Sequence, residues 1–426
     1  MPLGIYISVP FCRSKCSYCN FASGVFSNAK YQGYVDRVCR HMATADEIAD
    51  SMNAQLVDHA VDSVFLGGGT PSILETAQLE QLFRALRQHF DVSAASEITV
   101  ECAPGTLRAE MIDCLAHCGV NRVSLGVQSF IDQEARAVGR LHTRAIILDD
   151  IARLRAAGIH NLNVDLIAGL PHQTRQSWES SLQDALECAV PHLSVYMLEV
   201  DDDSRLGSEV MAGGKRYHAH AVPDDDLTAD LYLRACEVLN SAGVAQYEIS
   251  NFACAGCESR HNLKYWTRQP YIGFGVDAHS MLPPNIELKA AGVNAIRYSM
   301  PSELERFMGD GELSEPSDEI ISELSALEET FFLGLRLNQG IDLGAIEARF
   351  SSDDVAFISD KVANVCNLGL ATHQAGRLRL TERGRLLSNE VFEKFVALDI
   401  TEEELFEMLE AERLNELPVP NPAKTH

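Results

Sequence analysis

Three cysteines near the amino terminus have the spacing of an iron–sulfur ligand set. Cys12, Cys16 and Cys19 fall within eight residues, directly after an alternating apolar segment, 4–11, that predicts a strand. Three thiolates on one tight loop can each bind a different iron of a cubane cluster, which leaves the fourth iron without a protein ligand. An open iron position favours chemistry over storage, because another molecule must complete its coordination.

A zinc site and a disulfide loop are the alternatives for these cysteines. Zinc usually requires a fourth ligand close by in the sequence, and none follows promptly. A disulfide would leave one of the three cysteines over. We therefore interpret Cys12, Cys16 and Cys19 as ligands of a 4Fe-4S cluster.

The spacing of the triplet resembles the cysteine motif of the radical S-adenosylmethionine (SAM) superfamily, with three and then two residues between the cysteines. The resemblance implies that the amino and carboxylate groups of SAM chelate the open iron. It also implies that an electron from the cluster cleaves the sulfonium and releases a 5′-deoxyadenosyl radical.

The elements that must position this loop alternate along the first 200 residues. Strands are predicted at 61–66, 98–102, 121–128, 162–167 and 193–200, and helices at 75–90, 107–117, 146–157 and 176–189. This alternation predicts an α/β fold with βα units around a parallel sheet. Functional groups in such barrels gather at the carboxyl ends of the strands, where the cysteine loop also lies.

Polar and glycine residues follow several of these strands. The glycine run 67–69 is either a plain turn or a backbone grip that offers N–H groups to the amino-acid part of a ligand. Arg140 can pair with an anion, and Glu101, Gln128 and Asp165 can pair with hydroxyl or amine groups. Together these residue types suit a zwitterionic nucleoside.

Further motifs resemble the oxygen-independent coproporphyrinogen III oxidase family and occur in that family's order. They are Tyr6 and the segments 67–71, 101–104, 125–129, 139–142 and 165–171. The resemblance extends to about residue 300 and implies a partial (βα)6 TIM-like barrel. It implies that SAM is held by Tyr6, Tyr18, Gly68, Gly69, Thr70, Glu101, Gln128, Arg140 and Asp165.

A histidine beside two aromatic residues is the candidate heme site. His261 precedes Tyr265 and Trp266. Its imidazole offers an axial iron ligand, and the two aromatic rings beside it offer flat apolar surfaces for a porphyrin. The block resembles the His-Asn-x-x-Tyr-Trp block that is associated with heme binding in the heme-chaperone (HemW) branch. This implies heme ligation by His261, with His279 as the second candidate.

Cys254 and Cys257 offer an alternative role for His261, because the three residues together could hold a metal. They supply only three local ligands, which is one fewer than a structural zinc site needs. The role of the two cysteines stays open.

The remaining chain predicts a C-terminal, mostly helical and winged-helix-like domain. Helices are predicted at 319–337, 343–350 and 355–368, followed by a hairpin at 370–381 and a helix from 383. The predicted domains are a core at 1–240, an extension with the heme block at 241–300, the C-terminal domain at 301–417 and a disordered tail at 418–426. A Gly-, Lys- and His-rich insertion at 201–223 is expected over the barrel mouth.

The net charge of the chain limits the classes of molecule that it can bind. Lys and Arg number 35 against 61 Asp and Glu, so the net charge is −26. Such a field repels nucleic acid and anionic lipid surfaces, and a substrate with several carboxylates would need a local basic pocket. No segment has transmembrane length, and scattered free cysteines beside a reducible cluster predict a cytoplasmic location.

Two departures from the oxidase pattern decide between functions. The oxidases carry a fourth cysteine where this chain has Phe21 after Asn20, and a histidine where it has Ser8. We therefore predict a heme chaperone that uses a 4Fe-4S cluster, SAM and heme, and whose partners are a recipient hemoprotein and an electron donor. Oxidative decarboxylation of porphyrinogen propionates and radical methyl transfer are the alternatives, and coproporphyrinogen dehydrogenase activity is not expected.

Overall fold

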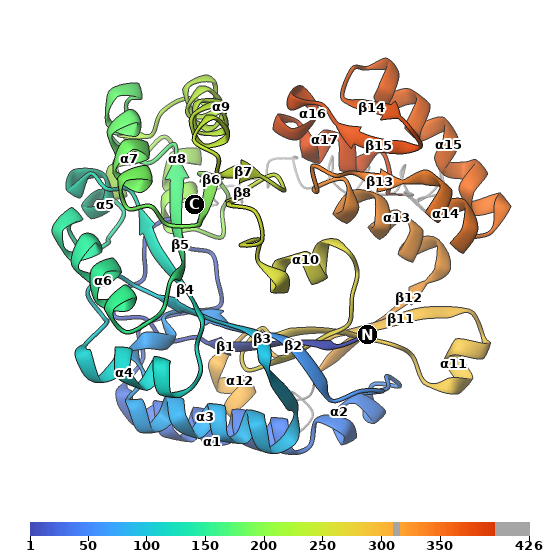
Figure 1. Ribbon diagram of the computed structural model, residues 1–426, viewed down its shortest axis with the longest axis horizontal. Coiled ribbons are helices and arrows are strands. Elements are labelled where there is room, and N and C mark those ends of the chain that lie inside the picture. The colour runs from blue at the N-terminus through green and yellow to red at the C-terminus, as the bar shows by residue number, and fades with distance from the viewer. Residues whose placement is uncertain (310–315, 397–426) are drawn as a thin grey trace, which may run out of the picture.

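Parallel strands in sequence order form the core of the molecule (Figure 1). The computed structural model describes residues 1–309 and 316–396. The six neighbouring strands are β1 (Leu3–Val9), β2 (Ala60–Gly68), β3 (Asp91–Cys102), β4 (Arg122–Gln128), β5 (Asn161–Ala168) and β6 (His192–Met197). This arrangement confirms the predicted α/β barrel core.

Helices connect these strands and cover their outer face. They are α1 (Tyr31–Ala43), α2 (Ala45–Ser51), α3 (Thr76–His89), α4 (Ala109–His117), α5 (Asp132–Ala137), α6 (Arg144–Ala156) and α7 (Arg175–Glu187), with short 3₁₀ turns η1 (Asn28–Lys30) and η2 (Pro71–Ile73). The strands are apolar because helices and the barrel interior bury both of their faces. Ile5, Ile7, Val64 and Leu66 are accordingly inaccessible to solvent.

The sheet stays open and grows at both edges. Next to β1 it continues through β9 (Tyr271–Phe274), β10 (His279–Leu282), β11 (Val293–Ser299) and β12 (Ser317–Ser322), and next to β6 through β8 (Asn251–Ala253) and β7 (Ala245–Gln246). Strand β9 runs parallel to β1, whereas β10, β11 and β12 are antiparallel. Residues of the predicted extension and of the predicted C-terminal domain thus share the barrel's sheet, and the predicted domain boundaries stay a prediction.

Five shorter helical elements complete this part of the chain. They are α8 (Arg205–Met211), η3 (Arg216–Ala221), α10 (Arg260–Trp266), α11 (Ile286–Ala290) and α12 (Leu304–Met308), beside the longer α9 (Asp225–Ser241). Within the described ranges, none of the helices combines the length and the apolar character that crossing a bilayer requires.

The C-terminal helices and hairpin are those that the sequence predicts. The elements are α13 (Glu323–Gly334), β13 (Ile341–Asp342), α14 (Leu343–Arg349), α15 (Ser352–Asn367), β14 (Ala371–Gln374), β15 (Arg377–Leu380), α16 (Glu382–Leu386) and α17 (Ser388–Glu393). Ala375 and Gly376 both have positive φ (51° and 74°), as a two-residue hairpin turn requires. The predicted tail at 418–426 lies outside the described residues.

Some predicted boundaries are wrong, and the first turn of the predicted helix 319–337 is the main case. Residues 317–322 form β12, because Ile320 and Ile321 pair with β11 at the edge of the sheet. The helix begins only after Ser322, whose hydroxyl accepts the Ser325 N–H at 3.0 Å as an N-cap. Strand β6 ends at Met197 instead of residue 200.

A buried ion triad joins the C-terminal domain to the sheet. Glu329 on α13 accepts from Arg268 at 2.7 Å and from Arg297 on β11 at 2.5 Å. The side chains of Arg268 and Glu329 are only 4% and 7% exposed, so each charge depends on its partner. Removing one member of such a group leaves a buried charge without compensation.

Glu329→Ala should therefore lower the free energy of unfolding by about 3–5 kcal/mol. The control is Glu305→Ala, which removes an exposed ion pair with Lys30 and should cost less than about 1 kcal/mol. Denaturant titration monitored by circular dichroism measures both. Equal losses for the two variants would contradict the structural role of the triad.

Candidate functional site

A cavity of about 380 Å³ lies where the carboxyl ends of the barrel strands meet. It collects predicted site residues from the loop after β1 and from the ends of the following strands: Cys12, Cys16, Tyr18, Cys19, Gly68, Gly69, Thr70, Glu101, Gln128, Arg140 and Asp165. Of the predicted cluster and SAM residues, only Tyr6 does not line it. The barrel topology thus brings together residues that are far apart in the sequence.

The cysteine loop is held by backbone contacts and by a lysine. The Cys12 N–H donates to Gly24 O and the Gly24 N–H donates to Pro10 O, both at 2.9 Å. The ammonium of Lys15 donates to Phe21 O at 2.7 Å and to Ser23 O at 2.8 Å. These bonds join the start of the loop to its end. Cys12, Cys16 and Cys19 are free thiols, so the disulfide alternative is wrong.

The three thiols are not arranged around a single metal ion. In residues 1–309 and 316–396, no group of three His, Cys, Asp or Glu side chains is close enough to hold one metal ion. A zinc site requires its ligands around one centre, whereas each thiolate of a cubane binds its own iron. The same finding removes the zinc alternative for Cys254, Cys257 and His261.

The glycine run packs against the cysteine loop. A Cβ on Gly69 would lie 2.6 Å from Val9 O and 2.8 Å from Phe11 O, and Gly68 has a φ of +93°. The N–H groups of Gly69 and Thr70 donate to those two carbonyls at 2.9 and 2.8 Å. The expectation that this run offers free N–H groups to a ligand is therefore wrong for Gly69, because its N–H, like that of the following Thr70, is bonded to the loop.

Gln128 and Arg140 present polar atoms that lack partners. The Gln128 Oε1 and Arg140 Nε atoms are buried and have no hydrogen-bond partner among the described residues. Gln128 ends β4 with a φ of +68°, a conformation that residues other than glycine adopt rarely. Arg140 is anchored by bonds to Gly126 O and, at 3.6 Å, to Cys16 Sγ. These unsatisfied atoms fit a polar ligand such as SAM.

Two carboxyl groups share the cavity. Burial, together with the nearby Asp165 carboxylate, raises the pKa of Glu101 to about 8. Burial also raises the pKa of Asp165, which accepts hydrogen bonds from Ser124 Oγ at 3.1 Å and Asn163 Nδ2 at 2.7 Å. At neutral pH the ligand-free cavity therefore holds a neutral Glu101, which can donate as well as accept a hydrogen bond.

Tyrosines surround this cavity at different depths. Tyr18 lines it between the second and third cysteines, as predicted. Tyr6 is not part of the lining, and its ring lies 6.2 Å from that of Phe65. Tyr196 and Ser124 also line the cavity and were missed by the sequence analysis. Tyr196 is the residue before the last residue of β6, Met197, and its position near a strand end was the signal available.

His261 lies in the interior, away from the cysteine loop. It is 1% exposed, its Nδ1 pairs with Ser63 Oγ at 3.1 Å, and its Nε2 pairs with Tyr265 Oη at 2.9 Å. Burial, with the charge of Lys264 nearby, lowers the pKa of His261 to about 3. Both ring nitrogens are thus engaged in a neutral imidazole. The second candidate, His279, is exposed at the start of β10.

The helix that carries His261 connects the barrel to the C-terminal domain (Figure 1). Lys264 is 2% exposed and bonds to Asp62 and to Pro2 O, both at 2.8 Å. The guanidinium of Arg336 lies 4.3 Å from the ring centroid of Trp266 and pairs with Glu248 at 3.3 Å. The predicted heme block is therefore packed from both sides in this conformation.

Known proteins resemble this chain over nearly its whole length. Residues 6–185 match the family described as the Radical SAM superfamily, and residues 321–387 match the HemN C-terminal domain. A protein named heme chaperone HemW from Lactococcus lactis is 32% identical over 94% of this chain and 98% of its own length. Proteins of the same name from Bacillus subtilis and Escherichia coli are 31% and 29% identical, over 92% and 93% of this chain and 98% of theirs. The chain belongs to the HemW family.

The fold agrees with this membership. Coproporphyrinogen III oxidase (HemN) from Escherichia coli superposes with a TM-score of 0.77 over 92% of this chain and 90% of its own, at 23% identity. That likeness shows a shared fold. Membership of the radical SAM superfamily implies a 4Fe-4S cluster and SAM for HemW-family chains such as this one.

Cys16→Ala should abolish the cluster, because the thiolate at the centre of the triplet has no replacement in the loop. After anaerobic reconstitution, iron content and visible cluster absorbance should fall to background. Cys257→Ala, which alters a cysteine outside the triplet, is the matched control and should keep both signals. Full iron content in the Cys16 variant would contradict the ligand assignment.

Glu101→Gln should make the ligand-free protein relatively more stable as the pH rises. The folded-state pKa of about 8 lies above the value of about 4.3 for an exposed glutamate. The folded state therefore binds this proton more tightly, and its contribution to stability declines between those two pH values.

Thermal unfolding at about pH 5.5 and about pH 8.5 measures this effect. The Tm of the Gln variant minus that of the unaltered protein should increase with pH. Glu110→Gln, at an exposed position, should show a constant difference. A constant difference for both variants would show that Glu101 is already ionised in the fold.

Proposed function

We propose that this chain is a heme chaperone, which binds heme and passes it to recipient hemoproteins. The observation that carries the proposal is the 32% identity to a heme chaperone HemW over 98% of that protein's length. The match covers 94% of this chain, and the two matched families lie in its amino-terminal core and its C-terminal domain.

The radical SAM core supplies the resident cofactors in this proposal. Cys12, Cys16 and Cys19 would hold the 4Fe-4S cluster, which when bound supplies the electron for cleavage of SAM. Arg140 and Gln128 would meet the charged and polar groups of SAM with the unpartnered atoms described above. Glu101 and Asp165 would position its hydroxyl or amine groups.

The remaining predicted SAM contacts complete the walls of the same cavity. The lining includes Tyr18, Gly68, Gly69 and Thr70, whereas Tyr6 is proposed as a SAM contact by the family resemblance alone. An electron donor for the cluster and a recipient hemoprotein are the partners that the proposal requires. A reducing, cytoplasmic setting follows from the cluster chemistry as part of the same proposal.

Porphyrinogen decarboxylation is the second candidate, because the fold is that of HemN. The residues beside the cluster loop disfavour it. Phe21 stands where the oxidases carry a fourth cysteine, and its side chain is 65% exposed at the cavity edge. Ser8, at the position of the oxidase histidine, is buried at 4% exposure. No residue favours methyl transfer over these two functions.

Heme titration followed by transfer to an apo-hemoprotein tests the proposal. The anaerobically reconstituted protein should bind hemin stoichiometrically and convert apomyoglobin to holomyoglobin faster than free hemin does. A parallel anaerobic assay with coproporphyrinogen III, SAM and a reductant should yield no decarboxylated product. Absent hemin binding together with turnover in that assay would replace the chaperone with the oxidase.

His261 is the heme ligand that the sequence predicts, but it can bind iron only after a change in its surroundings. Its Nε2 reaches iron only if the Tyr265 hydroxyl releases it and α10 leaves the barrel interior. Such an opening would also separate Trp266 from Arg336. Heme ligation by His261 would therefore couple heme binding to the contact between the two domains.

His261→Ala should lower the free energy of unfolding by about 1–3 kcal/mol, because the Ser63 and Tyr265 hydroxyls lose a buried partner. His117→Ala, at an exposed position, should change it by less than about 0.5 kcal/mol. The Soret band of the hemin complex then decides the second role. A shifted band would assign the ligand to His261, whereas an unchanged band would limit His261 to stabilising the fold.

A further inference from the structure

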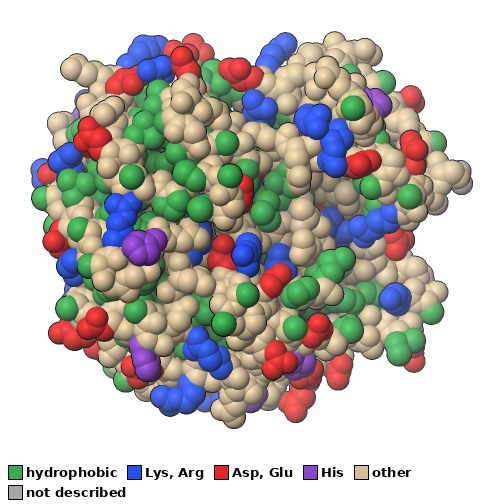
Figure 2. All heavy atoms as spheres, in the orientation of Figure 1, with side chains coloured by type: hydrophobic (Ala, Val, Ile, Leu, Met, Phe, Trp, Pro, Cys, Tyr) green, Lys and Arg blue, Asp and Glu red, His purple; other side chains and the backbone are tan. Residues whose placement is uncertain are grey.

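A basic cavity lies beside the cysteine loop, separate from the SAM cavity. Its volume is about 530 Å³, and the loop, α5, α8 and η3 contribute to its wall. The described residues that line it include no aspartate or glutamate but four cations, namely Lys15, Arg136, Arg205 and Lys215. Acidic and basic side chains are interspersed over the face seen in Figure 2, so this cavity differs from that surface.

The four cations have no carboxylate partner in the described part of the chain. Arg136 and Lys215 are exposed, and neither side chain makes an ion pair or a hydrogen bond with those residues. Lys15 and Arg205 donate hydrogen bonds to backbone carbonyls, which carry no full charge. In a chain with a net charge of −26, this cavity is therefore a local region of positive potential.

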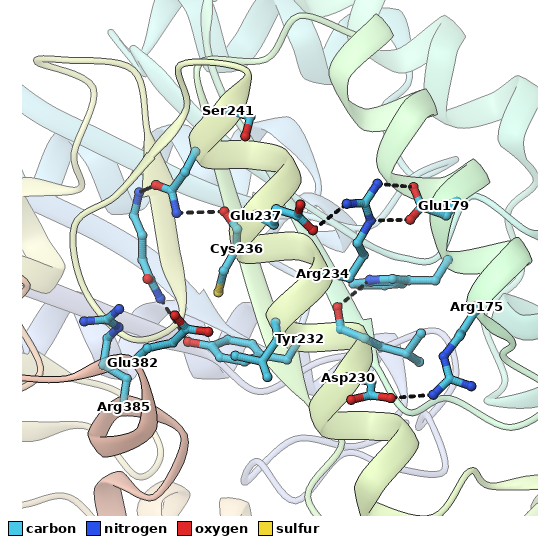
Figure 3. A pocket seen from close by; sticks show the side chains of 15 residues that line it. Arg175, Glu179, Asp230, Tyr232, Arg234, Cys236, Glu237, Ser241, Glu382 and Arg385 are labelled. Carbon is cyan, nitrogen blue, oxygen red and sulfur yellow. Dashed lines mark hydrogen bonds and ion pairs between the residues drawn. The ribbon is translucent and has the colours of Figure 1, made fainter. Parts of the chain in front are cut away.

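Another cavity shows the opposite arrangement. A space of about 670 Å³ between α7, α9 and α16 also contains arginines (Figure 3). There Arg175 pairs with Asp230. Arg234 pairs with both Glu179 and Glu237. The positive charges of that cavity are largely neutralised within the protein, whereas those of the basic cavity remain available to a partner.

The basic cavity lies against the backbone of Cys16, a predicted cluster ligand. Ser17, the next residue, lines the cavity, and the Arg205 guanidinium donates to Cys16 O at 3.4 Å. Gly139 also lines the cavity, and a Cβ on Gly139 would lie 3.8 Å from Cys16 Cα. Residues of the cavity wall are thus in direct contact with the backbone of a cluster ligand.

The Cys16 thiol belongs to the other cavity. It lines the SAM cavity, and its sulfur lies 3.6 Å from Arg140 Nη1. Among the described residues, Lys15 is the only one that lines both cavities. A molecule at the basic cavity would therefore approach Cys16 from its backbone side and leave the SAM cavity to its own ligand.

The surroundings of the basic cavity favour a protein over a small anion. Small ligands are usually enclosed by their sites, whereas the side chains of Arg136 and Lys215 are exposed. Leu141, two residues after Gly139, is 74% exposed. Protein interfaces combine such apolar contacts with a polar rim.

Charge limits where an acidic protein can bind to this chain. With a net charge of −26 the chain repels such a partner over most of its surface, and the unpaired cations of the basic cavity attract it. Opposite charges speed the encounter and orient the two proteins. Because electron transfer slows steeply with distance, an electron donor must dock close to a cluster ligand, and the basic cavity meets that condition.

We propose that the basic cavity is the docking site of an acidic one-electron donor protein, whose carboxylates pair with Arg136 and Lys215. This inference rests on the cluster of the proposed function and names the surface at which its electron donor binds. One electron passes from the reduced flavin or iron–sulfur centre of the donor to the oxidised cluster. The donor is thus oxidised and the cluster reduced by one electron each, and no atom is transferred.

The test is the affinity of the reconstituted protein for an acidic flavodoxin, measured by calorimetry at low salt. Arg136→Glu/Lys215→Glu should bind it at least about tenfold more weakly, since two attractive charges become repulsive. Lys289→Glu/Lys394→Glu makes the same change in net charge at exposed positions elsewhere and should bind flavodoxin like the unaltered protein. In about 1 M salt, where the Debye length is about 3 Å, the difference between the two double variants should disappear.

The rate of cluster reduction is a second readout. Flavodoxin hydroquinone should reduce the cluster of Arg136→Glu/Lys215→Glu at least about tenfold more slowly than that of the control, as followed by visible absorbance in an anaerobic stopped-flow instrument. Reduced methyl viologen, a small cation, should reduce both clusters completely, which shows that the variants have intact clusters.

Equal flavodoxin affinity of the two double variants would overturn the inference, as would equal reduction rates or failure of the unaltered protein to bind flavodoxin at low salt. Phosphate binding that only Arg136→Glu/Lys215→Glu loses, with unchanged flavodoxin binding, would instead make the cavity a small-anion site.

Hemin titration of the same preparations separates this inference from the proposed function. Failure of the unaltered protein to bind hemin would refute the chaperone and leave the donor site intact. Normal hemin binding with equal flavodoxin affinity of the two double variants would refute the donor site and leave the chaperone intact.

Discussion

One close contact between two backbone segments positions the whole candidate site. Gly69, just after β2, lies so near the carbonyls of Val9 and Phe11 that any side chain there would overlap them. Residues 12–27, between those carbonyls and η1, contain no helix or strand. The three thiols therefore take their place relative to the strand ends from this contact and from the few bonds that close the loop. A radical SAM core depends on this proximity, because cluster and SAM must meet.

The cysteine loop separates two cavities of different chemistry. On one side, partly unsatisfied polar groups and two carboxyls with raised pKa values suit a zwitterionic nucleoside. On the other side, a second cavity is lined by Lys15, Arg136, Arg205 and Lys215, and none of these cations pairs with a carboxylate of the described residues.

The interior around α10 has a structural task in the described conformation. His261, Lys264 and Trp266 each bind a different partner, on β2, on the amino-terminal segment and in the C-terminal domain. Together with the Glu329 triad they hold the domain on the open sheet. The segment that resembles a heme-binding motif thus also connects the barrel to the C-terminal domain. A ligand can reach His261 only if these contacts break.

The sequence by itself determined the cluster ligands and the order of strands and helices, because cysteine spacing and apolar periodicity are local signals. It also indicated Glu101, Gln128, Arg140 and Asp165, since strand ends of a parallel barrel meet at one edge. Only the tertiary structure decided which atoms are free. The N–H groups of Gly69 and Thr70 donate hydrogen bonds to the cysteine loop and are not free for a ligand. Ile320 pairs with strand β11, although its sequence pattern predicts a helix. The burial of His261 and the gathering of Arg136, Lys215 and His218 depend on contacts between distant segments, which no local pattern encodes.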